Sequence, residues 1–398
     1  MTGAMTGIKV LDFSQIVSGP MAACMLADQG ADVIKLEAPT GDPVRAFGPG
    51  KGNMSATYIT VNRGKRGLAL DLKAPEAAEI VAALIGWADV LIENFRPGAM
   101  ERLGYGPARC AEINPQLIYA SVTGFGPDGP YRNIRVYDPA VQAVSGIAAT
   151  QLDAAGHPSL VASLMADKLT ALTAAQAITA ALLARERTGV AQQVAVSMLD
   201  AAIAFNWPEA MYNHSFLDDP PAPVPNYSDL ARLWPARDGQ VAIGVLQDAE
   251  FVALCAAIER PDLAADPRFT RAAGRALYRD DWLPAVATEI ASRDVDTLMA
   301  AFIATGAVGG RAIDISVGPD DDHTGAQRRE PLNEQAVALA AVLIHETAGH
   351  REHHGQARLL AHTLAVLQRL TVNGERCEVR LGPLGPHRYR VETGDRCF

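Results

Sequence analysis

The residue of this chain best placed for chemistry is a single carboxylate, Asp167, at the start of a long apolar stretch. Apolar side chains follow it at a spacing that puts them on one face of a helix: Ala171, Ala174, Ile178, Ala181 and Leu182. A carboxylate can serve as a covalent nucleophile if it is held ionised beside an electrophile. A helix N-terminus stabilises that ionised form, but an aspartate in a first turn usually serves the helix dipole alone. Residue type and position leave both interpretations open.

The helix that would carry Asp167 has clear signals at its far end. Its last turn is basic, with Arg185 and Arg187, and Gly189 follows in the position of a left-handed cap. Residues 192–198, QQVAVSM, then predict a strand, and Asp200 opens another apolar helix. The carboxylate is therefore predicted at the N-terminal end of a helix that leads directly into a strand.

Apolar strands alternate with helices through the preceding part of the chain. Strands are predicted over residues 8–13, 31–37, 68–73, 89–95 and 117–125, and helices from Pro20 to Gly30 and over 76–88. This alternation predicts an α/β, Rossmann-like domain with a parallel sheet covered on both faces. Ligands of such sheets bind beyond the carboxyl ends of the strands. Residues 48–53, GPGKGN, fit neither a P-loop nor a dinucleotide fingerprint, and we interpret them as a mobile loop.

Composition narrows the class of protein. The chain has 398 residues, which predicts two domains, and 20% charged residues with about half apolar, which is typical of a globular protein with ample core. A net charge of −10 argues against nucleic acid as a partner but leaves room for a local basic pocket that binds an anion. The five cysteines are scattered, no secretion signal opens the chain, and no apolar run is long enough to span a membrane. We therefore expect a cytoplasmic protein with reduced thiols.

The second half of the sequence changes in character. Residues 220–228 are proline-rich and predict a linker, residues 232–246 a hairpin, and residues 247–259, 275–293 and 295–306 helices. We predict a large domain over residues 1–218, a smaller α+β domain over 219–317 and a C-terminal return to the large domain over 318–398.

The C-terminal region is rich in histidine. Residues 333–370 predict a long helix, followed by two short strands in 377–394. Glu346, His350 and His354 share a helix face and could hold zinc, but a solvated polar face is the more common use of such a pattern. We therefore expect no metal.

Six ordered blocks, together with the stretch from Ser163 to Asp200, resemble the class III CoA-transferases, the family that includes formyl-CoA transferase, carnitine CoA-transferase and the α-methylacyl-CoA racemases. The blocks are KVLDFSQIVSGP (9–20), GADVIKLEAPTGDPVR (30–45), NRGKRGLALDLK (62–73), ADVLIENFRPGAMERLG (88–104), INPQLIYASVTGFG (113–126) and YDPAVQAVSG (137–146). One block alone would be weak, but six in order are specific. Residues from about 318 onward do not follow the family pattern.

The resemblance assigns roles to particular residues. It implies that Asp167 is the nucleophile and that coenzyme A, as an acyl-CoA substrate, contacts Asn94, Phe95, Arg102, Arg135 and Tyr137. It also implies that the acyl pocket is lined by Gln15, Ile16, Val17, Ser18 and Gln142. The partners would be an acyl-CoA and a small carboxylic acid. Family members are interlocked homodimers, so a homodimer is expected here too.

Three departures from the family pattern refine this expectation. Ala38 stands where several relatives have an arginine against the adenine, which weakens that contact. No glycine-rich flap occurs in residues 220–240, which disfavours oxalate–formate chemistry. Tyr137 occupies the position where the racemase branch has a histidine, which disfavours racemisation.

The main hypothesis is a CoA-transferase that moves CoA between acids through covalent intermediates on Asp167. Two alternatives stay open. The chain could be an acyl-CoA racemase that uses Asp167 as a base, or a non-catalytic CoA-binding or assembly protein with a diverged C-terminus.

Overall fold

A computed structural model of the chain describes residues 3–153, 155–218, 222–223 and 232–312, together with the backbone of four strands between residues 371 and 393. By internal contacts the chain divides into two compact units, Met1–Arg311 and Ala312–Phe398. The three-part division with boundaries at 218 and 317 is a finer one and stays a prediction.

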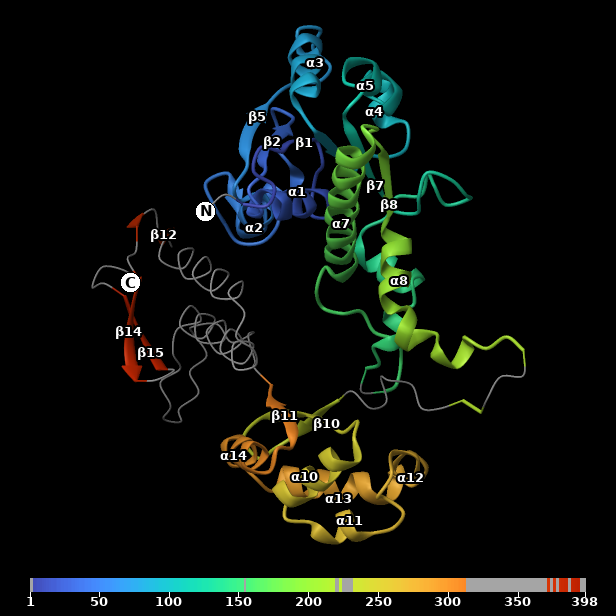
Figure 1. The fold of residues 1–398 in the computed structure, drawn as a ribbon, viewed down its shortest axis with the longest axis vertical. Helices are drawn as coiled ribbons and strands as arrows, with labels where there is room; N and C mark the ends of the chain where they lie inside the picture. The colour runs from blue at the N-terminus through green and yellow to red at the C-terminus, as the bar shows by residue number, and fades with distance from the viewer. Residues whose placement is uncertain are drawn as a thin grey trace. The chain divides into compact units, whose positions relative to one another are not determined.

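A six-stranded sheet forms the centre of the N-terminal part of the chain (Figure 1). Its order is β5-β2-β1-β6-β7-β8, and every neighbouring pair is parallel. The strands are β1 (Lys9–Asp12), β2 (Asp32–Glu37), β5 (Arg66–Ala69), β6 (Val90–Glu93), β7 (Ile118–Thr123) and β8 (Gln193–Ser197). The predicted parallel α/β sheet is confirmed. Because β1 pairs with both β2 and β6, the chain reverses its winding direction between β1 and β6, where such sheets bind ligands.

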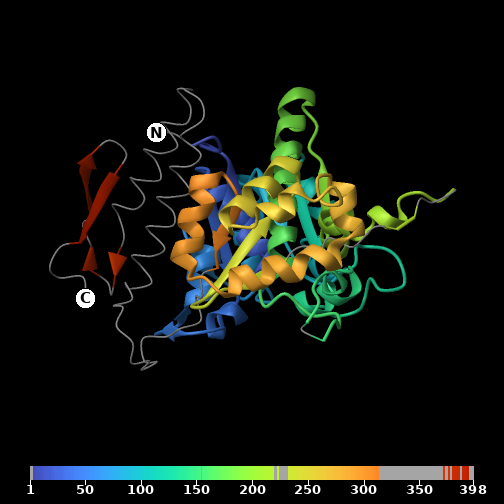
Figure 2. The ribbon, with the colours of Figure 1, turned by 90° about the horizontal axis from the view of Figure 1, so that it is seen from below.

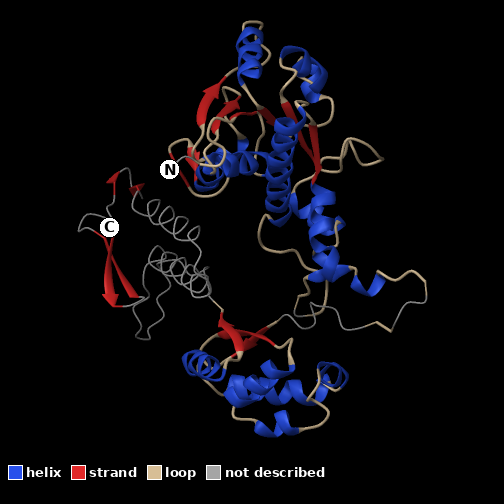
Figure 3. Ribbon diagram, viewed as in Figure 1, coloured by secondary structure: helices blue, strands red, loops and turns tan. Residues whose placement is uncertain are grey.

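Both faces of this sheet are buried, as the apolar strands predicted. Alternate side chains point to opposite faces, so Val10 and Ile92 join one core cluster and Leu11 and Leu91 join the other. Helices α1 (Ser18–Asp28) and α7 (Met165–Thr188) cover the first face, and α3 (Ala77–Trp87), α4 (Ala99–Arg102) and α5 (Pro107–Ile113) cover the second (Figure 3).

The remaining helices beside this sheet are short, apart from the one that follows β8. They are α2 (Ala56–Asn62), α6 (Asp138–Val144) and α8 (Met198–Ala210), with 3-10 turns at Pro43–Ala46, Ala148–Thr150 and Tyr212–His214. Residues predicted as a loop around 48–53 form a small hairpin of β3 (Gly50–Lys51) and β4 (Met54–Ser55).

Several predicted boundaries differ from the structure, and two of them are informative. Helix α1 begins at Ser18 rather than Pro20, directly after a loop whose Gln15 and Ile16 N–H groups are held by Asn94 and Asp42. The third strand spans Arg66–Ala69 rather than 68–73, because its register on β2 ends where Glu37 pairs with Ala69. Helix α7 ends as predicted, at Thr188, and Gly189 caps it with a left-handed φ of 72°.

A three-stranded antiparallel sheet with its own helices follows in the chain. Strands β9 (Leu233–Pro235) and β10 (Gln240–Gly244) form the predicted hairpin, and β11 (Val308–Arg311), which the sequence pattern did not indicate, pairs with β10. The helices are α10 (Asp248–Ala257), α11 (Pro261–Ala265), α12 (Ala272–Leu277), α13 (Arg279–Ala291) and α14 (Val295–Thr305). Helices α10, α11, α13 and α14 share one apolar core with Trp234 and Val241 of the sheet. Figure 2 shows the same helices from another side.

The C-terminal unit is described only as two antiparallel strand pairs. These are β12 (Thr371–Val372) with β13 (Glu375–Arg376), and β14 (Val379–Gly385) with β15 (Arg388–Thr393), the second matching the two strands predicted there. The histidine-rich helix and the zinc hypothesis on Glu346, His350 and His354 lie outside the described residues. Among the helices that are described, none is long and apolar enough to cross a membrane.

Candidate functional site

The loop that follows β1 is held by hydrogen bonds between its backbone and the side chains of Asn94 and Asp42. Asn94, at the end of neighbouring β6, accepts a hydrogen bond from the Gln15 N–H at 2.7 Å and donates one to the Gln15 carbonyl at 2.7 Å. The Ile16 N–H donates to the Asp42 carboxylate at 3.1 Å. Ile16 has a φ of 68°, a strained value for a β-branched residue. Side chains from two other strand ends therefore hold this loop in a conformation that it would not adopt alone.

Beneath the loop lies a paired charge cluster. Lys35 is 1% exposed, donates to the Ser14 carbonyl and lies 3.2 Å from Asp42 and 3.8 Å from Asp12. Lys65 reaches the same Asp12 at 2.8 Å. Burial alone would raise the pKa of Asp12, but the two lysines outweigh it and hold that pKa below its usual value. The buried charges of this cluster are therefore paired with one another, and Lys35 and Asp42 bind the loop from below.

The loop delivers the first turn of α1 to the predicted nucleophile. Ser18, 4% exposed, acts on the Asp167 carboxylate through hydrogen bonds from both its side chain and its backbone. Gly19 lets this turn lie against Ser14, since a Cβ at Gly19 would come within 2.3 Å of the Ser14 Cβ. Asp167 is itself 8% exposed in the first turn of α7. Its carboxylate therefore lies at the N-termini of two helices.

Alanines bring those two helices together. Ala22 of α1 packs in one core cluster with Ala171 and Ala174 of α7, and Ala23 packs in the next with Ala181. All five side chains of the predicted apolar face of α7 are buried: Ala171, Ala174, Ile178, Ala181 and Leu182. Small side chains on both helices allow a close approach, which places the start of α1 beside Asp167.

A second buried carboxylate, that of Asp138, lies beside Asp167. Asp138, the first residue of α6, is 1% exposed, and its Oδ2 accepts the Asp167 N–H at 2.8 Å. Its Oδ1 accepts Nε2 of Gln142 at 2.5 Å. Gln142 in turn donates to the Ser163 carbonyl at 3.0 Å and accepts from the Val161 N–H at 2.9 Å. Asp138 and Gln142 thus tie α6 to the segment that enters α7.

Asp167, the predicted nucleophile, has an unusual pKa. Burial, and next the charge of Asp138, raise the pKa of Asp167 to about 6, while the hydrogen bonds from Ser18 oppose the rise. A carboxylate of this pKa is mostly ionised at neutral pH and is a stronger base than an ordinary aspartate. This is the state that nucleophilic attack requires.

The end of β6 supplies a further titratable group. Glu93 is buried and accepts the Phe95 N–H at 2.8 Å. Burial raises the pKa of Glu93 to about 7, against opposing hydrogen bonds from Ser121 and the Phe95 backbone. Phe95 itself is partly buried against the core under α3 and α4.

The structure locates the predicted site residues in three settings. Asp167, Ser18, Val17 and Gln142 are buried around the start of α7, although the hydrogen bonds of Gln142 make it a brace rather than an open pocket wall. Gln15, Ile16 and Asn94 are half-buried where Asn94 binds the loop that follows β1. The exposed set is Arg102, Arg135 and Tyr137.

The exposed set is free to meet a ligand. Arg102 ends α4, Arg135 lies between β7 and α6, and Tyr137 is 72% exposed just before α6. Within the described part of the chain, neither arginine forms an ion pair and no contact joins this set to Asp167. Ala38 is exposed beyond the end of β2 and offers no charge.

Sequence reasoning missed the residues that position the site. Asp138 lay within a matched block and Asp12, Lys35 and Asp42 within others, but nothing in their local pattern marked them as buried partners. A buried lysine or aspartate in an otherwise apolar strand was the available signal, because such charges are rarely buried without a partner.

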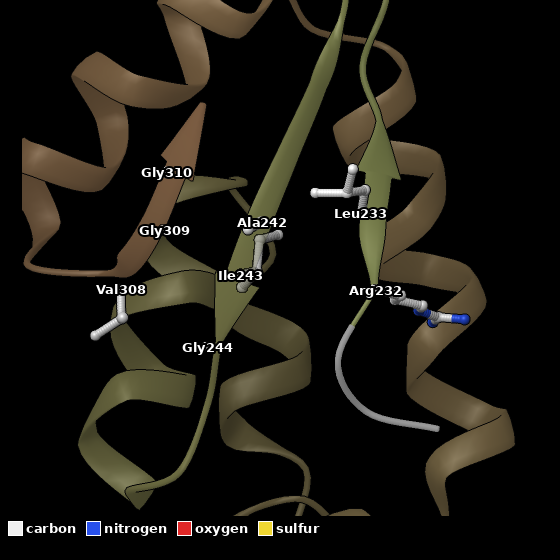
Figure 4. Close-up of a pocket in the computed structure, with 8 residues that line it drawn as sticks. All are labelled: Arg232, Leu233, Ala242, Ile243, Gly244, Val308, Gly309 and Gly310. Carbon is white, nitrogen blue, oxygen red and sulfur yellow. The ribbon is translucent and has the colours of Figure 1, made fainter. Parts of the chain in front are cut away.

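A recess elsewhere in the described part of the chain is lined by none of these residues. Figure 4 shows it on the β9–β11 sheet, with a volume of about 530 Å³. Its lining is Arg232, Leu233, Ala242, Ile243, Gly244, Val308, Gly309 and Gly310. These residues include no carboxylate or thiol, so the recess has no nucleophile and contains none of the predicted site residues.

Comparison with known proteins gives the same class of protein as the site. Residues 5–331 match the sequence profile of CoA-transferase family III. The chain is similar to an acetyl-CoA:oxalate CoA-transferase of Acetobacter aceti, 39% identical over 272 residues that cover 67% of this chain and 70% of that protein. It is also similar to a succinyl-CoA:mesaconate CoA-transferase of Haloarcula hispanica, 36% identical over 311 residues that cover 75% of this chain and 77% of that protein.

A solved structure agrees. A CaiB/BaiF family protein from Brucella suis aligns with a TM-score of 0.68 at 29% identity, covering 86% of this chain and all of the other. The chain therefore belongs to CoA-transferase family III, and its enzyme class is that of a class III CoA-transferase.

Proposed function

We propose that this enzyme transfers CoA from an acyl-CoA to a small carboxylic acid through covalent intermediates on Asp167. The observation that supports the proposal most directly is the Asp167 carboxylate itself. It is buried, more basic than an ordinary aspartate, and set against the start of α1. CoA thioesters and carboxylates are the substrates that the family and its named relatives imply.

The first half of the cycle loads CoA onto the enzyme. The Asp167 carboxylate attacks the thioester carbonyl and expels CoA thiolate, which gives a mixed anhydride. The thiolate then attacks the aspartyl carbonyl of that anhydride, releasing the first acid as a carboxylate and leaving an aspartyl-CoA thioester. The energy of the thioester bond is conserved throughout, provided that water is excluded.

The second half reverses these steps with the acceptor. The acceptor carboxylate attacks the aspartyl thioester, expelling thiolate and forming a second anhydride. The thiolate attacks the acceptor's carbonyl in that anhydride, which yields the new acyl-CoA and regenerates the Asp167 carboxylate. Each attack places negative charge on a carbonyl oxygen beside Asp167, where N–H groups at the start of α1 are suited to stabilise it.

The remaining predicted residues would bind the substrate. Arg102 and Arg135, exposed and without ion pairs in the described chain, are suited to the phosphates of CoA because a guanidinium offers a fixed fork of donors. Phe95 would flank the adenine and Tyr137 would order the acyl group. Gln15, Ile16, Val17 and Ser18 would line the acyl end, while Asn94 and Gln142 hold that lining in place.

We also propose that the enzyme works as a cytoplasmic homodimer. Helix α8 exposes two large aromatic side chains in the single chain, Phe205 at 61% and Trp207 at 50%. Large apolar side chains that are exposed close together are often covered by a partner. Cys24, Cys110 and Cys255 are free thiols, in keeping with a reducing compartment. Light scattering should give the mass of two chains, and the mass of one chain would contradict the dimer.

Trapping the intermediate tests the transfer mechanism. Incubation with a panel of acyl-CoAs, a quench with hydroxylamine or borohydride, and peptide mass spectrometry should show a mass change at Asp167 alone. Asp167→Ala should lose the adduct and slow CoA exchange by a factor on the order of 10⁴. Asp200→Asn removes an exposed first-turn aspartate from the next helix and should match the wild type. Exchange that persists in Asp167→Ala would refute the covalent route.

A further inference from the structure

The contacts of Asp138, at the start of α6, differ from those of the lysine-paired Asp12. Asp138 is 1% exposed, both of its oxygens accept hydrogen bonds, and the donors are an amide side chain and a backbone N–H. Both-oxygen acceptance is the bonding pattern of the ionised form. Within the described chain it forms no ion pair with a lysine, arginine or histidine, whereas Asp12 has two lysines. Its negative charge is therefore left uncompensated beside Asp167.

The groups that face Asp167 are few. From α6 comes the Asp138 carboxylate, and from α1 come the hydroxyl and backbone N–H of Ser18. On α7 itself, Lys168 is exposed and its ammonium donates to the Ser163 hydroxyl at 2.6 Å, not to Asp167. Asp138 is thus the one charged partner acting on Asp167 among the residues that the structure describes.

The negative charge of Asp138 favours the covalent intermediates of the proposed cycle over the free Asp167 carboxylate. The free Asp167 carboxylate is repelled by Asp138, whereas an anhydride or thioester on Asp167 carries no charge and is not repelled. We propose that Asp138 is a positioning residue that raises the free energy of the Asp167 carboxylate relative to the covalent intermediates, while its bond to the Asp167 N–H fixes the first turn of α7. This inference rests on the proposed covalent transfer at Asp167.

Asp138→Asn tests the charge with little change in shape. Adduct on Asp167 is measured from pH 4.5 to 8 after a fixed exposure to the acyl-CoA that labels the wild type best. The wild-type profile should rise with a midpoint near pH 6. In Asp138→Asn the midpoint should fall by at least one pH unit, so that adduct at pH 5, relative to the plateau, is about fivefold higher than in the wild type. Because the same repulsion is lost, the equilibrium ratio of adduct to free enzyme at pH 8 should fall about tenfold.

Two matched variants separate charge from geometry. Asp200→Asn removes an exposed charge and should leave midpoint and plateau at wild-type values. Gln142→Ala breaks the brace but keeps the Asp138 charge, so it should slow adduct formation without lowering the midpoint. If Asp138→Asn does not fold, Asp138→Ser offers a neutral hydroxyl acceptor to the same N–H and carries the same expectation.

The outcomes distinguish the two proposals. Wild-type adduct together with an unchanged midpoint in a folded Asp138 variant would overturn this inference and leave covalent transfer standing. The absence of adduct from the wild type with every acyl-CoA would overturn covalent transfer, and this inference with it.

Discussion

Two buried aspartates at the carboxyl end of one sheet behave in opposite ways. Asp12, at the end of β1, is fully buried between Lys35 and Lys65, and these lysines hold its pKa below the ordinary value despite burial. Asp167 is nearly as buried but has another carboxylate as its charged neighbour, and its pKa is raised to about 6. Burial alone does not mark a functional carboxylate. The sign of the neighbouring charge separates Asp12 from Asp167, the proposed nucleophile.

The two sites are also linked in space. The Asp12 and Lys35 cluster supports the loop through Ser14 and Asp42, and that loop carries Ser18 to Asp167. The paired charges of Asp12 and Lys35 therefore help to hold Ser18 beside Asp167, whose charged neighbour is another carboxylate. Enzymes commonly hold a destabilised group in this way, on a surrounding structure that overdetermines its position.

The largest effect is expected on the free energy of unfolding, when a lysine partner of the buried aspartates is removed. Lys35→Met leaves Asp42 without its buried cation and Asp12 with one lysine instead of two. The free energy of unfolding should fall by about 3–5 kcal/mol at pH 7, since an unpaired charge stays buried. Urea unfolding measures this, with Arg66→Met, which breaks an exposed pair with Asp32, as a control that should cost under about 1 kcal/mol. Equal losses of stability in the two variants would show that the buried pairs of Lys35 contribute no more than an exposed ion pair.

Asp167→Asn should do the opposite and stabilise the protein. The folded-state pKa of about 6 lies above the unfolded value, so the ionised carboxylate weakens the fold increasingly as pH rises from about 4 through 6. Removing the charge should raise the free energy of unfolding by roughly 3 kcal/mol at pH 8 and by almost nothing at pH 4. Thermal or urea unfolding across this range measures the gain. A variant that is less stable than the wild type at pH 8 would show that Asp167 is compensated after all.

The smallest effect is a shift in pH dependence. In the wild type, kcat/KM should fall as pH drops below about 6, because attack needs the ionised Asp167. Ser18→Ala removes a hydrogen bond that favours the ionised form, so the pKa of Asp167 should rise and the acid limb should move to higher pH by about one unit or less. Ser145→Ala, which removes a hydroxyl that donates to the Gln142 carbonyl of the same helix, is the control. A shift to lower pH in Ser18→Ala would contradict the assignment of that bond.

Much of the fold was open to prediction from the sequence. Apolar stretches at residues 8–13, 31–37, 68–73, 89–95 and 117–125, together with 192–198, predicted the six strands of the sheet, because strands buried on both faces have little choice of residue type. The course of α7 followed from its apolar spacing and from Gly189. Strand β11, with two glycines in four residues, carries too weak a pattern to be found without its partner β10.

The position of Asp167 was also open to prediction from the sequence, since the local signals put it in the first turn of a helix. Its role, and the roles that the resemblance assigns to Asn94, Ser18 and Gln142, stay predictions. What the sequence could not decide is the state of those groups. The pKa of Asp167, the brace formed by Gln142, and the pairing of Lys35 with Asp12 and Asp42 depend on contacts between residues that are distant in the chain, such as Ser18 and Asp167. Electrostatic energies depend on distance and burial in three dimensions, and only the tertiary structure sets those.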